Sequence, residues 1–594
     1  MLSRRIHLQL FGRTACALAT GAAAFLLCPE ARASITVSTY PATAQAGVAL
    51  ENMSGSTQAI GPNVDDDPSS IKDIGFDFWF DGVRYTQFSV NPNGICRLGP
   101  SVIDGVFDNS GGFPSTDNAP KICPYFDDLQ VGSNGQVHYK LVGTAPNRKL
   151  VIEWLNMQVP RVGFGVPGAG IFQLWLSETT GRVELVYGGG MVNNPDGNGY
   201  TVGLQSGAGT NFASVTTATS AVSYVTPNDS QIDAIAAGRS FRFSPLIPAA
   251  PTTLTFTTVT PTSMRLNWVD NATNEVGYVI YRSIDNVVFN FITQTGPNTN
   301  FHVASSLSPA TTYFWRVYAV SQGGLSNVLA GSKATTTPIT ITAAQTGNWS
   351  STSTWTGGVV PTANDNVVIA ARTVTINTSA FALNVIVGSD TNQGGTLKFE
   401  TSTARTLVVG QSVTVKSDGT FSTETSNASS QTGHALAVGE NINVAGKLDF
   451  STNPNFTGNN AAAKIVFNGA NNSTFSGSGV FNTDVREIEL TKSGGAAVEL
   501  NFPNPPTPGN SLTVRGTTND PVGFLTLTSG LLKISGNFPI SSPLFKTPAY
   551  TIPATSGIWL SNANFTVAGT ASGQTTSNDG LLRVTQGTYN IGIG

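Results

Sequence analysis

The sequence predicts an all-β protein, and three observations lead to this prediction. Charged residues make up only 11% of the 594 residues, which disfavours long charged helices and coiled coils. Glycine is abundant, with 63 residues, and Thr, Ser and Asn are frequent, as in chains of short strands joined by polar turns. Hydrophobic residues reach 40%, which is enough for packed cores. The length predicts about three to five domains, and the formal net charge of -4 argues against a nucleic-acid partner.

The first 33 residues have the pattern of a signal peptide. Arg4 and Arg5 precede a short apolar stretch, residues 15–27, and Ala31-Arg32-Ala33 supplies a small-x-small cleavage pattern. That stretch is too short to cross a bilayer of about 30 Å, and no later stretch is long enough for a membrane span. We therefore expect a secreted or cell-surface protein, exported by the general or the twin-arginine route.

Two cysteines remain once the signal peptide is removed, Cys96 and Cys123. An even pair in an oxidising compartment favours one disulfide between them, although two buried free thiols would fit the sequence too. Two cysteines cannot build a tetrahedral thiolate site for zinc, so no such metal centre is predicted.

Residues 34–247 predict one large β domain. Two alternating runs, 76–80 and 85–90, flank Asp81-Gly82, a dipeptide typical of tight hairpins. A second hairpin is expected around Gly181-Arg182, between residues 172–176 and 183–187.

Three segments of this domain, in this order, resemble a nidogen-type extracellular β domain. They are 74–91, Pro124-Tyr125-Phe126-Asp127-Asp128-Leu129 and 147–154. The resemblance implies a module of large exported bacterial surface proteins. The family usually has Ala-Pro before its aromatic-Asp-Asp segment, where this chain has Cys123-Pro124, so a disulfide special to this relative is expected.

Two acidic clusters in this domain are candidates for calcium, which would be the protein's one cofactor. Asp127 and Asp128 form the stronger cluster, and Asp65-Asp66-Asp67 the other. Calcium takes six to eight oxygens, so adjacent carboxylates need partners from elsewhere in the fold. The alternative is turn chemistry, in which Asp caps its own backbone.

Residues 248–338 predict a smaller β domain. Trp268 lies in an alternating strand, and Leu307-Ser308-Pro309-Ala310-Thr311-Thr312-Tyr313 precedes a long one. Both features resemble a fibronectin type III domain, the first matching its core tryptophan and the second its tyrosine corner. The resemblance implies a seven-stranded sandwich and says little about function. A spacer is the default role that we expect for it.

Residues 339–594 predict a glycine-rich β-solenoid. Short alternating runs such as 373–376 and 407–409 recur between Gly, Asn and Ser turns, and each is too short to bury a core unless coils stack. A parallel β-helix fits best, with a pair of sandwiches as the fallback. The chain ends within what reads as another coil, so this region is expected to be incomplete at its C-terminus.

The start of this region resembles the glycine-rich extracellular domain of fibrocystin and related surface proteins. The match runs from Gly347-Asn348-Trp349 through Trp355 to the run at 373–376. The family usually has Gly-His before that run, whereas this chain has Ala371-Arg372.

Trp349 and Trp355 are the candidate ligand-binding residues, because sugars stack on exposed aromatic rings in polar surroundings. The alternative is that both rings plug the first coil of the solenoid. For catalysis, Glu487 and Glu489 would lie on one strand face about 6.6–7 Å apart, a pattern that a solvated strand face also produces.

The sequence thus predicts a non-catalytic exported scaffold, adhesin-like, whose partners are extracellular glycans or surface proteins. The alternative is a polysaccharide lyase or glycosidase with its site on the solenoid.

Overall fold

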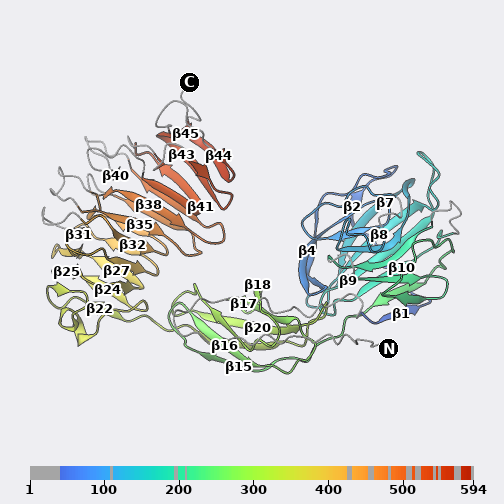
Figure 1. Cartoon of the computed structure of the whole chain (residues 1–594), viewed down its shortest axis with the longest axis horizontal. Helices are drawn as coiled ribbons and strands as arrows, with labels where there is room; N and C mark the ends of the chain where they lie inside the picture. The colour runs from blue at the N-terminus through green and yellow to red at the C-terminus, as the bar shows by residue number, and fades with distance from the viewer. Residues whose placement is uncertain are drawn as a thin grey trace, which may run out of the picture. The chain divides into compact units, whose positions relative to one another are not determined.

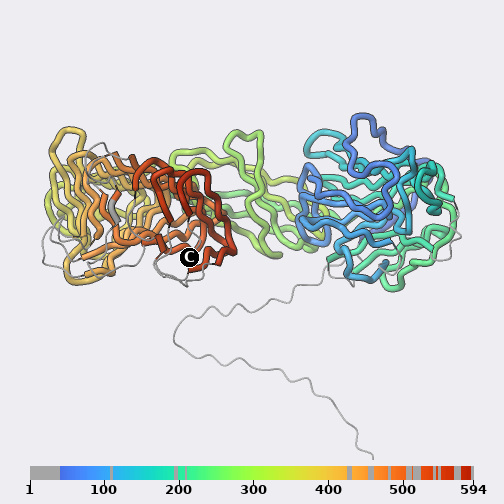
Figure 2. Tube along the Cα trace, turned by 90° about the horizontal axis from the view of Figure 1, so that it is seen from above, coloured from blue at the N-terminus to red at the C-terminus, as the bar shows by residue number. Residues whose placement is uncertain are grey.

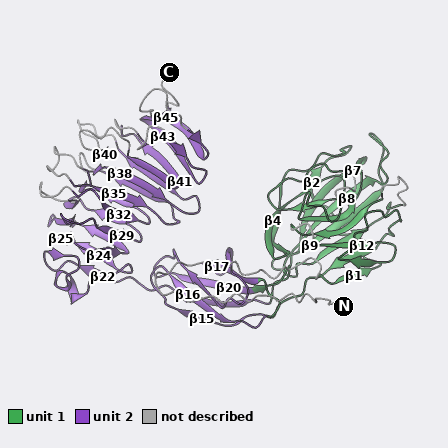
Figure 3. Ribbon diagram, viewed as in Figure 1, with its two compact units in different colours: residues 1–249, 273–276, 319–326 green, residues 250–272, 277–318, 327–594 purple. Residues whose placement is uncertain are grey.

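The computed structural model describes residues 40–107, 112–192, 199–207, 211–423, 431–451, 461–478, 483–503, 512–514, 524–539, 544–545, 550–567 and 577–589. The expected signal peptide, residues 1–33, and the last residues, 590–594, lie outside this part. The chain divides into two compact units (Figure 3), which are described separately. Within the described residues, no helix has the length and apolar character needed to cross a membrane.

The first unit is a sandwich of two seven-stranded sheets, ordered β1-β14-β10-β9-β8-β7-β2 and β13-β12-β11-β6-β5-β4-β3 (blue to green in Figure 1). All their pairings are antiparallel, as expected for strands joined by hairpins. The strands are β1 (Ala42–Gln45), β2 (Thr57–Ile60), β3 (Lys72–Phe80), β4 (Val83–Val90), β5 (Cys96–Leu98), β6 (Lys121–Phe126), β7 (Gln130–Val142), β8 (Lys149–Gln158), β9 (Gly170–Ser177), β10 (Val183–Tyr187), β11 (Thr201–Gln205), β12 (Phe212–Thr216), β13 (Ala221–Ser223) and β14 (Ser240–Phe243).

Both expected hairpins of this sandwich are present. Phe80 pairs with Val83 across Asp81-Gly82, whose φ angles of 51° and 74° are those of a primed two-residue turn. Strands β9 and β10 pair across the second turn. Between the sheets, Trp154 stacks on Phe172 with ring centroids 5.1 Å apart and donates its indole N–H to the backbone, so this polar group is satisfied inside the core.

Two short segments that follow later in the chain, 273–276 and 319–326, belong to the first unit. The Gly82 N–H donates to the Gln322 carbonyl over 2.7 Å, and the Leu325 N–H donates to the Thr179 carbonyl over 3.2 Å. Gly181 has φ +60°, and a Cβ there would collide with the Gly323 carbonyl. Glycine is therefore required at this turn both by its conformation and by the close approach of the backbone.

The fibronectin-like region forms a sheet of order β15-β16-β19 and a sheet of order β18-β17-β20-β21, which confirms the expected seven strands. Trp268 is buried against Tyr278, with ring centroids 5.3 Å apart. The Tyr313 hydroxyl accepts the Ser308 N–H over 2.7 Å, so the tyrosine corner is formed. The strands are β15 (Thr252–Thr257), β16 (Met264–Val269), β17 (Gly277–Ser283), β18 (Asn290–Gln294), β19 (Phe301–Ala304), β20 (Thr312–Val320) and β21 (Leu329–Ala334).

The C-terminal region is a β-solenoid, as predicted, and not a pair of sandwiches. From β24 to β38, each coil places one strand in each of three parallel ladders, as β24, β25 and β26 do, and each strand pairs in register with the next coil. Strand β41 then pairs with both β38 and β39 and joins two of the ladders. Figure 2 shows the coils following one another from yellow to red. The strands and 3-10 turns are β22 (Thr340–Thr342), β23 (Gly347–Asn348), η3 (Thr352–Thr354), η4 (Thr356–Gly358), β24 (Asn366–Ile369), β25 (Thr373–Ile376), β26 (Ala380–Ala382), β27 (Asn384–Val387), β28 (Gly395–Phe399), β29 (Thr406–Val409), β30 (Val413–Val415), β31 (Gly419–Ser422), β32 (His434–Val438), β33 (Ile442–Val444), β34 (Lys447–Asp449), β35 (Ala463–Phe467), β36 (Ser473–Gly477), β37 (Thr483–Val485), β38 (Glu487–Thr491), β39 (Ala497–Phe502), β40 (Leu512–Val514), β41 (Leu525–Gly536), β42 (Thr551–Ile552), β43 (Ser556–Val567), β44 (Ser577–Asn578) and β45 (Leu581–Tyr589).

The solenoid core consists of columns of like side chains. Strands such as β24, β25 and β27 alternate between half-buried and buried residues, and parallel pairing in register places apolar residues of successive coils on top of one another. Aromatic rings form one such column, in which Phe475, Phe502, Phe538 and Phe565 meet edge to face at 5.0–5.9 Å. Each coil is therefore covered by its neighbours.

We expect Tyr313→Phe to destabilise the fibronectin-like sandwich by about 1 kcal/mol, because the backbone N–H of Ser308 loses its acceptor on the buried Tyr313 ring. Hydrogen exchange of the peptide covering residues 305–313 should become faster, and chemical denaturation should show the loss of stability. Thr312→Ala, at an exposed position of the same strand, is the control and should leave both unchanged. Equal protection in Tyr313→Phe and the parent would contradict a stabilising role for the tyrosine corner.

Candidate functional site

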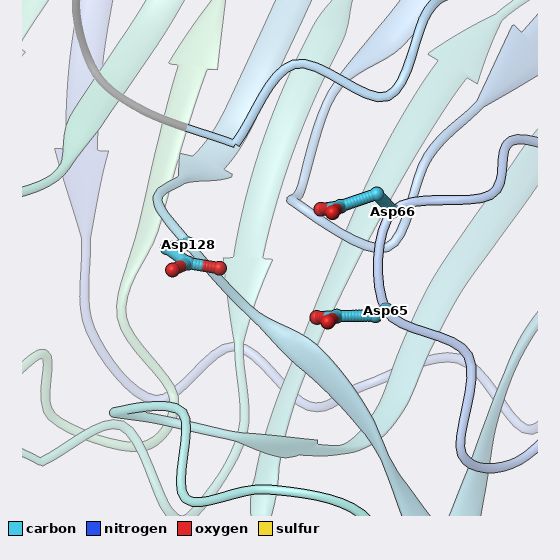
Figure 4. Close-up of side chains that lie close together, drawn as sticks. All are labelled: Asp65, Asp66 and Asp128. Atoms are coloured by element: carbon cyan, nitrogen blue, oxygen red, sulfur yellow. The ribbon is translucent and has the colours of Figure 1, made fainter.

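Three carboxylates of the first unit lie close together. Asp65, Asp66 and Asp128 each offer an oxygen within 4.8 Å of the others, and their carboxylates face a common space (Figure 4). Asn93 fixes this arrangement, because its amide donates to Asp66 over 3.0 Å and its carbonyl oxygen accepts the Leu129 N–H over 2.9 Å. The two acidic segments, far apart in sequence, are thus joined by one side chain.

Arg161 supplies positive charge to this cluster. One guanidinium nitrogen contacts both oxygens of Asp128 at 3.2 Å, and another forms an ion pair with Asp65. Burial raises the pKa of Asp65, and the neighbouring Asp66 and Asp128 charges add to this effect, while Arg161 opposes it. The cluster offers the oxygen ligands that calcium prefers, with the guanidinium already neutralising two of its members.

Asp127 and Asp128, the predicted calcium ligands, take different positions in the structure. Asp128 belongs to the cluster, whereas Asp127 is buried and accepts the backbone N–H of Asp128 over 2.9 Å. Asp127 therefore acts in the turn, which was the alternative interpretation. Asp65 and Asp66 take its place beside Asp128, and only the sheet topology brings them there.

The predicted disulfide between Cys96 and Cys123 is not formed, and the strand register gives the reason. Cys96 pairs with Ile122 of the neighbouring strand, so Cys123 lies one residue further and faces the opposite side of the sheet. Cys96 packs into the core between the two sheets, and Cys123 into a separate cluster with Phe113 and Phe212. Two thiols on opposite faces cannot be bridged without moving the backbone. Both are buried free thiols in this structure.

Trp349 and Trp355, the expected glycan-binding residues, are core residues in this structure. They are 0% and 2% exposed, and their rings meet edge to face at 5.0 Å. The Trp355 indole N–H donates to the Trp349 carbonyl over 2.8 Å. Neither ring has an exposed face on which a sugar could stack, so the prediction of a glycan-binding site at these tryptophans is wrong for this structure. Both rings fill the first coil of the solenoid, which is the alternative interpretation.

A polar groove of about 310 Å³ opens on the solenoid. Lys464, Arg486 and Glu487 line it at the starts of β35 and β38, together with His434. Lys464 forms an ion pair of 2.7 Å with Glu489, which raises the pKa of this lysine. The groove therefore gathers both signs of charge around a volume that could hold a small polar group.

The imidazole of His434 forms the inner wall of this groove in its neutral form. Burial lowers the pKa of His434, and its ring stacks on Phe399 with centroids 4.6 Å apart. Its Nδ1 accepts the Arg405 N–H over 3.1 Å. Sequence reasoning missed this groove because its residues come from three coils.

Trp559 was also missed. All eight tryptophans of the chain lie in the described residues, and Trp559 is the one among them that is not buried. In-register pairing places it between Lys533 and Arg583, whose charged groups lie 4.8 Å and 4.3 Å from the ring centroid. These distances are those of cation–π contacts. The alternating pattern of the strand could have indicated that the Trp559 ring points outward.

Comparisons with known proteins identify two of the regions. The NIDO-related family profile matches residues 39–245, and the fibronectin type III profile matches residues 249–332. No curated protein matches the sequence significantly. Among solved structures, FN3tt and a fibronectin type III domain of human collagen XX are each 27% identical and each cover 15% of this chain, with a TM-score of 0.14. The matches cover 95% and 91% of those chains, respectively.

We expect Arg161→Gln to lower the melting temperature of the first unit, because three clustered carboxylates lose their counter-charge. The loss should be about 1 kcal/mol, since the guanidinium is partly exposed and screened. The pKa of Asp65 is raised even with Arg161 present, and Arg161 opposes that rise. Without Arg161 the pKa of Asp65 should be higher still, so the folded variant should bind protons more readily than its unfolded chain. Its stability should therefore fall as pH rises above the ordinary carboxyl pKa, and the deficit against the parent should shrink between pH 7 and pH 4.

Arg97→Gln is the matched control, because this arginine contacts a backbone carbonyl instead of a carboxylate. Thermal unfolding across this pH range checks the prediction. A deficit that is independent of pH, or equal in both variants, would contradict the electrostatic account.

The thiols of Cys96 and Cys123 should resist alkylation in the folded protein. Burial raises the pKa of both, that of Cys123 to about 12, and the thiolate is the reactive form. After denaturation without reductant, mass spectrometry should find both residues alkylated. A reduced sample is the control, and a linked Cys96–Cys123 peptide in the unreduced digest would overturn the assignment of free thiols.

Proposed function

We propose that this chain, with its NIDO-related and fibronectin type III domains, is an exported, non-catalytic scaffold of the cell surface or matrix. It would act like an adhesin and bind extracellular glycans or surface proteins. Both domains are typical of extracellular proteins. The single observation that carries the proposal is the modular architecture, in which two β-sandwich regions precede a β-solenoid in one chain. Such modules present extended surfaces on rigid cores.

The solenoid groove is the first surface on which to seek a partner. Its volume and its Lys464, Arg486 and Glu487 lining suit a polar ligand with hydrogen-bonding groups and a negative charge, such as a uronate of an acidic glycan. The groove lies on rigid strands, which favours a preformed site. A protein partner would instead use broader faces of the sandwiches.

A polysaccharide-acting enzyme is the second candidate, and one observation favours it. Glu487 lines the groove, and Glu489 lies two residues along the same strand. A glycosidase uses two carboxylates in different roles. Because Glu489 is engaged by Lys464, this pair is better placed to organise the groove than to transfer protons, and we favour the non-catalytic function.

Affinity electrophoresis of the full chain tests the proposal, in native gels that contain alginate, pectate or neutral dextran. We expect an acidic polymer to retard the chain, and Lys464→Ala/Arg486→Ala to weaken this retardation by about tenfold or more in apparent Kd. Lys416→Ala/Lys398→Ala, which removes the same charge elsewhere on the solenoid, is the matched control and should be retarded like the parent.

If both double variants are retarded like the parent, the glycan-binding site lies outside the groove. If no polymer retards the chain, binding to immobilised surface proteins tests the protein-partner form of the proposal. New reducing ends or unsaturated sugars released from a retarding polymer would overturn the non-catalytic assignment and favour the enzyme.

A further inference from the structure

A row of polar side chains crosses the outer face of one sheet of the N-terminal sandwich. His138 of β7 pairs in register with Glu153 of β8, which pairs in register with Gln173 of β9. Val137 and Ile152, which alternate with them along the strands, pack into the core between the two sheets. The row therefore points away from that core. Even so, His138 and Glu153 are only 3% and 6% exposed.

The connection between β1 and β2 covers this row and brings Ser56 to it. Leu50 and Met53 of the connection pack on a small apolar cluster of the same face. Lys140 donates to two backbone carbonyls of the connection, over 2.6 and 3.3 Å, and the Ser56 N–H donates to the Met53 carbonyl over 3.1 Å. The side chain of Ser56, which is partly exposed, is thus held at a fixed place beside the row.

Ser56, His138 and Glu153 form a chain of two short hydrogen bonds. The Ser56 hydroxyl lies 2.6 Å from Nδ1 of His138, and Nε2 of the same ring lies 2.6 Å from the Glu153 carboxylate. An ionised carboxylate only accepts hydrogen bonds, so the imidazole proton is assigned to Nε2. Nδ1 is then the unprotonated nitrogen, and the Ser56 hydroxyl donates to it. In this arrangement an imidazole can act as a general base toward a hydroxyl.

Further contacts hold the Glu153 carboxylate in this orientation. Its second oxygen accepts the side-chain amide of Gln173 over 2.6 Å. Gln173 is itself fixed, because its oxygen accepts the Trp175 indole N–H over 2.7 Å and the Glu51 backbone N–H over 2.9 Å. Glu153 acts through His138, so it is a positioning residue that sets the tautomer of the imidazole.

A donor for the negative charge that develops on an attacked carbonyl lies next to the hydroxyl. Nε2 of Gln136 is 3.2 Å from the same Nδ1 of His138 that Ser56 contacts. Gln136 is partly exposed, and its oxygen accepts the side-chain amide of Gln58 over 3.1 Å, which fixes its orientation. An amide nitrogen carries two N–H groups, so one can donate to a substrate oxygen while the other contacts His138.

We propose that Ser56 is an activated nucleophile that takes the acyl group of a small carboxylic ester. The Ser56 oxygen attacks the ester carbonyl carbon while Nδ1 of His138 takes the hydroxyl proton. The bond between that carbon and the alkoxy oxygen then breaks, and the alcohol leaves with the proton from His138. The product is an acyl-serine, and the step involves no oxidation or reduction. A small acyl group is expected because the side chain of Ser56 is partly buried.

This reactivity goes beyond the proposed scaffold function and is independent of the solenoid groove. A single acylation per chain is compatible with a non-catalytic scaffold, because the serine is then modified once and not regenerated. Hydrolysis of the acyl-serine by water would instead regenerate the hydroxyl and make this domain an esterase. The experiment therefore follows both the formation of the adduct and its fate.

Reaction of the full chain with a fluorophosphonate, a probe for activated serine hydroxyls, tests the proposal. Mass spectrometry should find the phosphonyl group on Ser56 and not on Ser54, an exposed serine two residues earlier. His138→Gln should slow the labelling at least about a hundredfold, because the general base is lost. Ser54→Ala is the matched control and should be labelled like the parent.

Glu153→Gln tests the positioning role. Its amide can donate to Nε2 of His138 and so place the imidazole proton on Nδ1, which should slow labelling of Ser56 at least about tenfold. Circular dichroism and thermal unfolding check that each variant is folded. A merely structural Glu153 would change the melting temperature of the variant but not the labelling rate of the folded chain.

The acyl transfer itself is measured with p-nitrophenyl acetate. We expect a burst of about one p-nitrophenol per chain and an acetyl group on Ser56, both absent from Ser56→Ala. An unlabelled Ser56 in the parent, or equal labelling rates in the parent and a folded His138→Gln, would overturn the proposal and leave a structural hydrogen-bond network. Steady turnover after the burst would support the nucleophile and contradict the non-catalytic assignment, whereas glycan retardation tests the groove alone.

Discussion

The alternation of apolar and polar side chains along short strands is the constraint on which every described region depends. In the N-terminal sandwich, alternate residues of two seven-stranded sheets meet in one core. In the solenoid, the same alternation works only because coils pair in parallel and in register, so that the inward residue of one coil covers that of the next. No single coil could bury its own apolar side, which makes the solenoid cooperative between neighbours.

Strand register also decides which polar groups become partners. A shift of one residue turns a side chain to the other face, which separates Cys96 from Cys123, whereas direct pairing brings His138 beside Glu153. The buried Lys492 shows how such groups are accommodated, because its ammonium donates to the carbonyls of Gly439 and Asn471. Burial lowers its pKa to about 8. Because the chain has few charged residues, a buried polar group such as the Lys492 ammonium is satisfied by nearby backbone carbonyls and not by an opposite charge.

Local motifs made the fold largely predictable from the sequence. The tyrosine corner at Tyr313 depends on a contact five residues away, and the Asp81-Gly82 hairpin on adjacent residues. The candidate sites were harder to predict, because they depend on contacts between distant segments. Asp65 meets Asp128 only through the sheet topology, and the groove at Lys464 combines residues of three coils. Trp349 and Trp355 lie in a polar segment, so the sequence could not show that both rings turn inward.

The in-register coils have a consequence for how such a protein changes over evolutionary time. Because each coil contacts only its neighbours and adds about 4.8 Å along the axis, duplication or deletion of one whole coil would alter the solenoid's length in fixed steps. The columns on either side of the new junction would still match, since the added coil repeats the same inward pattern. Insertions of partial coils would break every column at once. Length can therefore vary in this region while the sequences of the preceding domains stay the same.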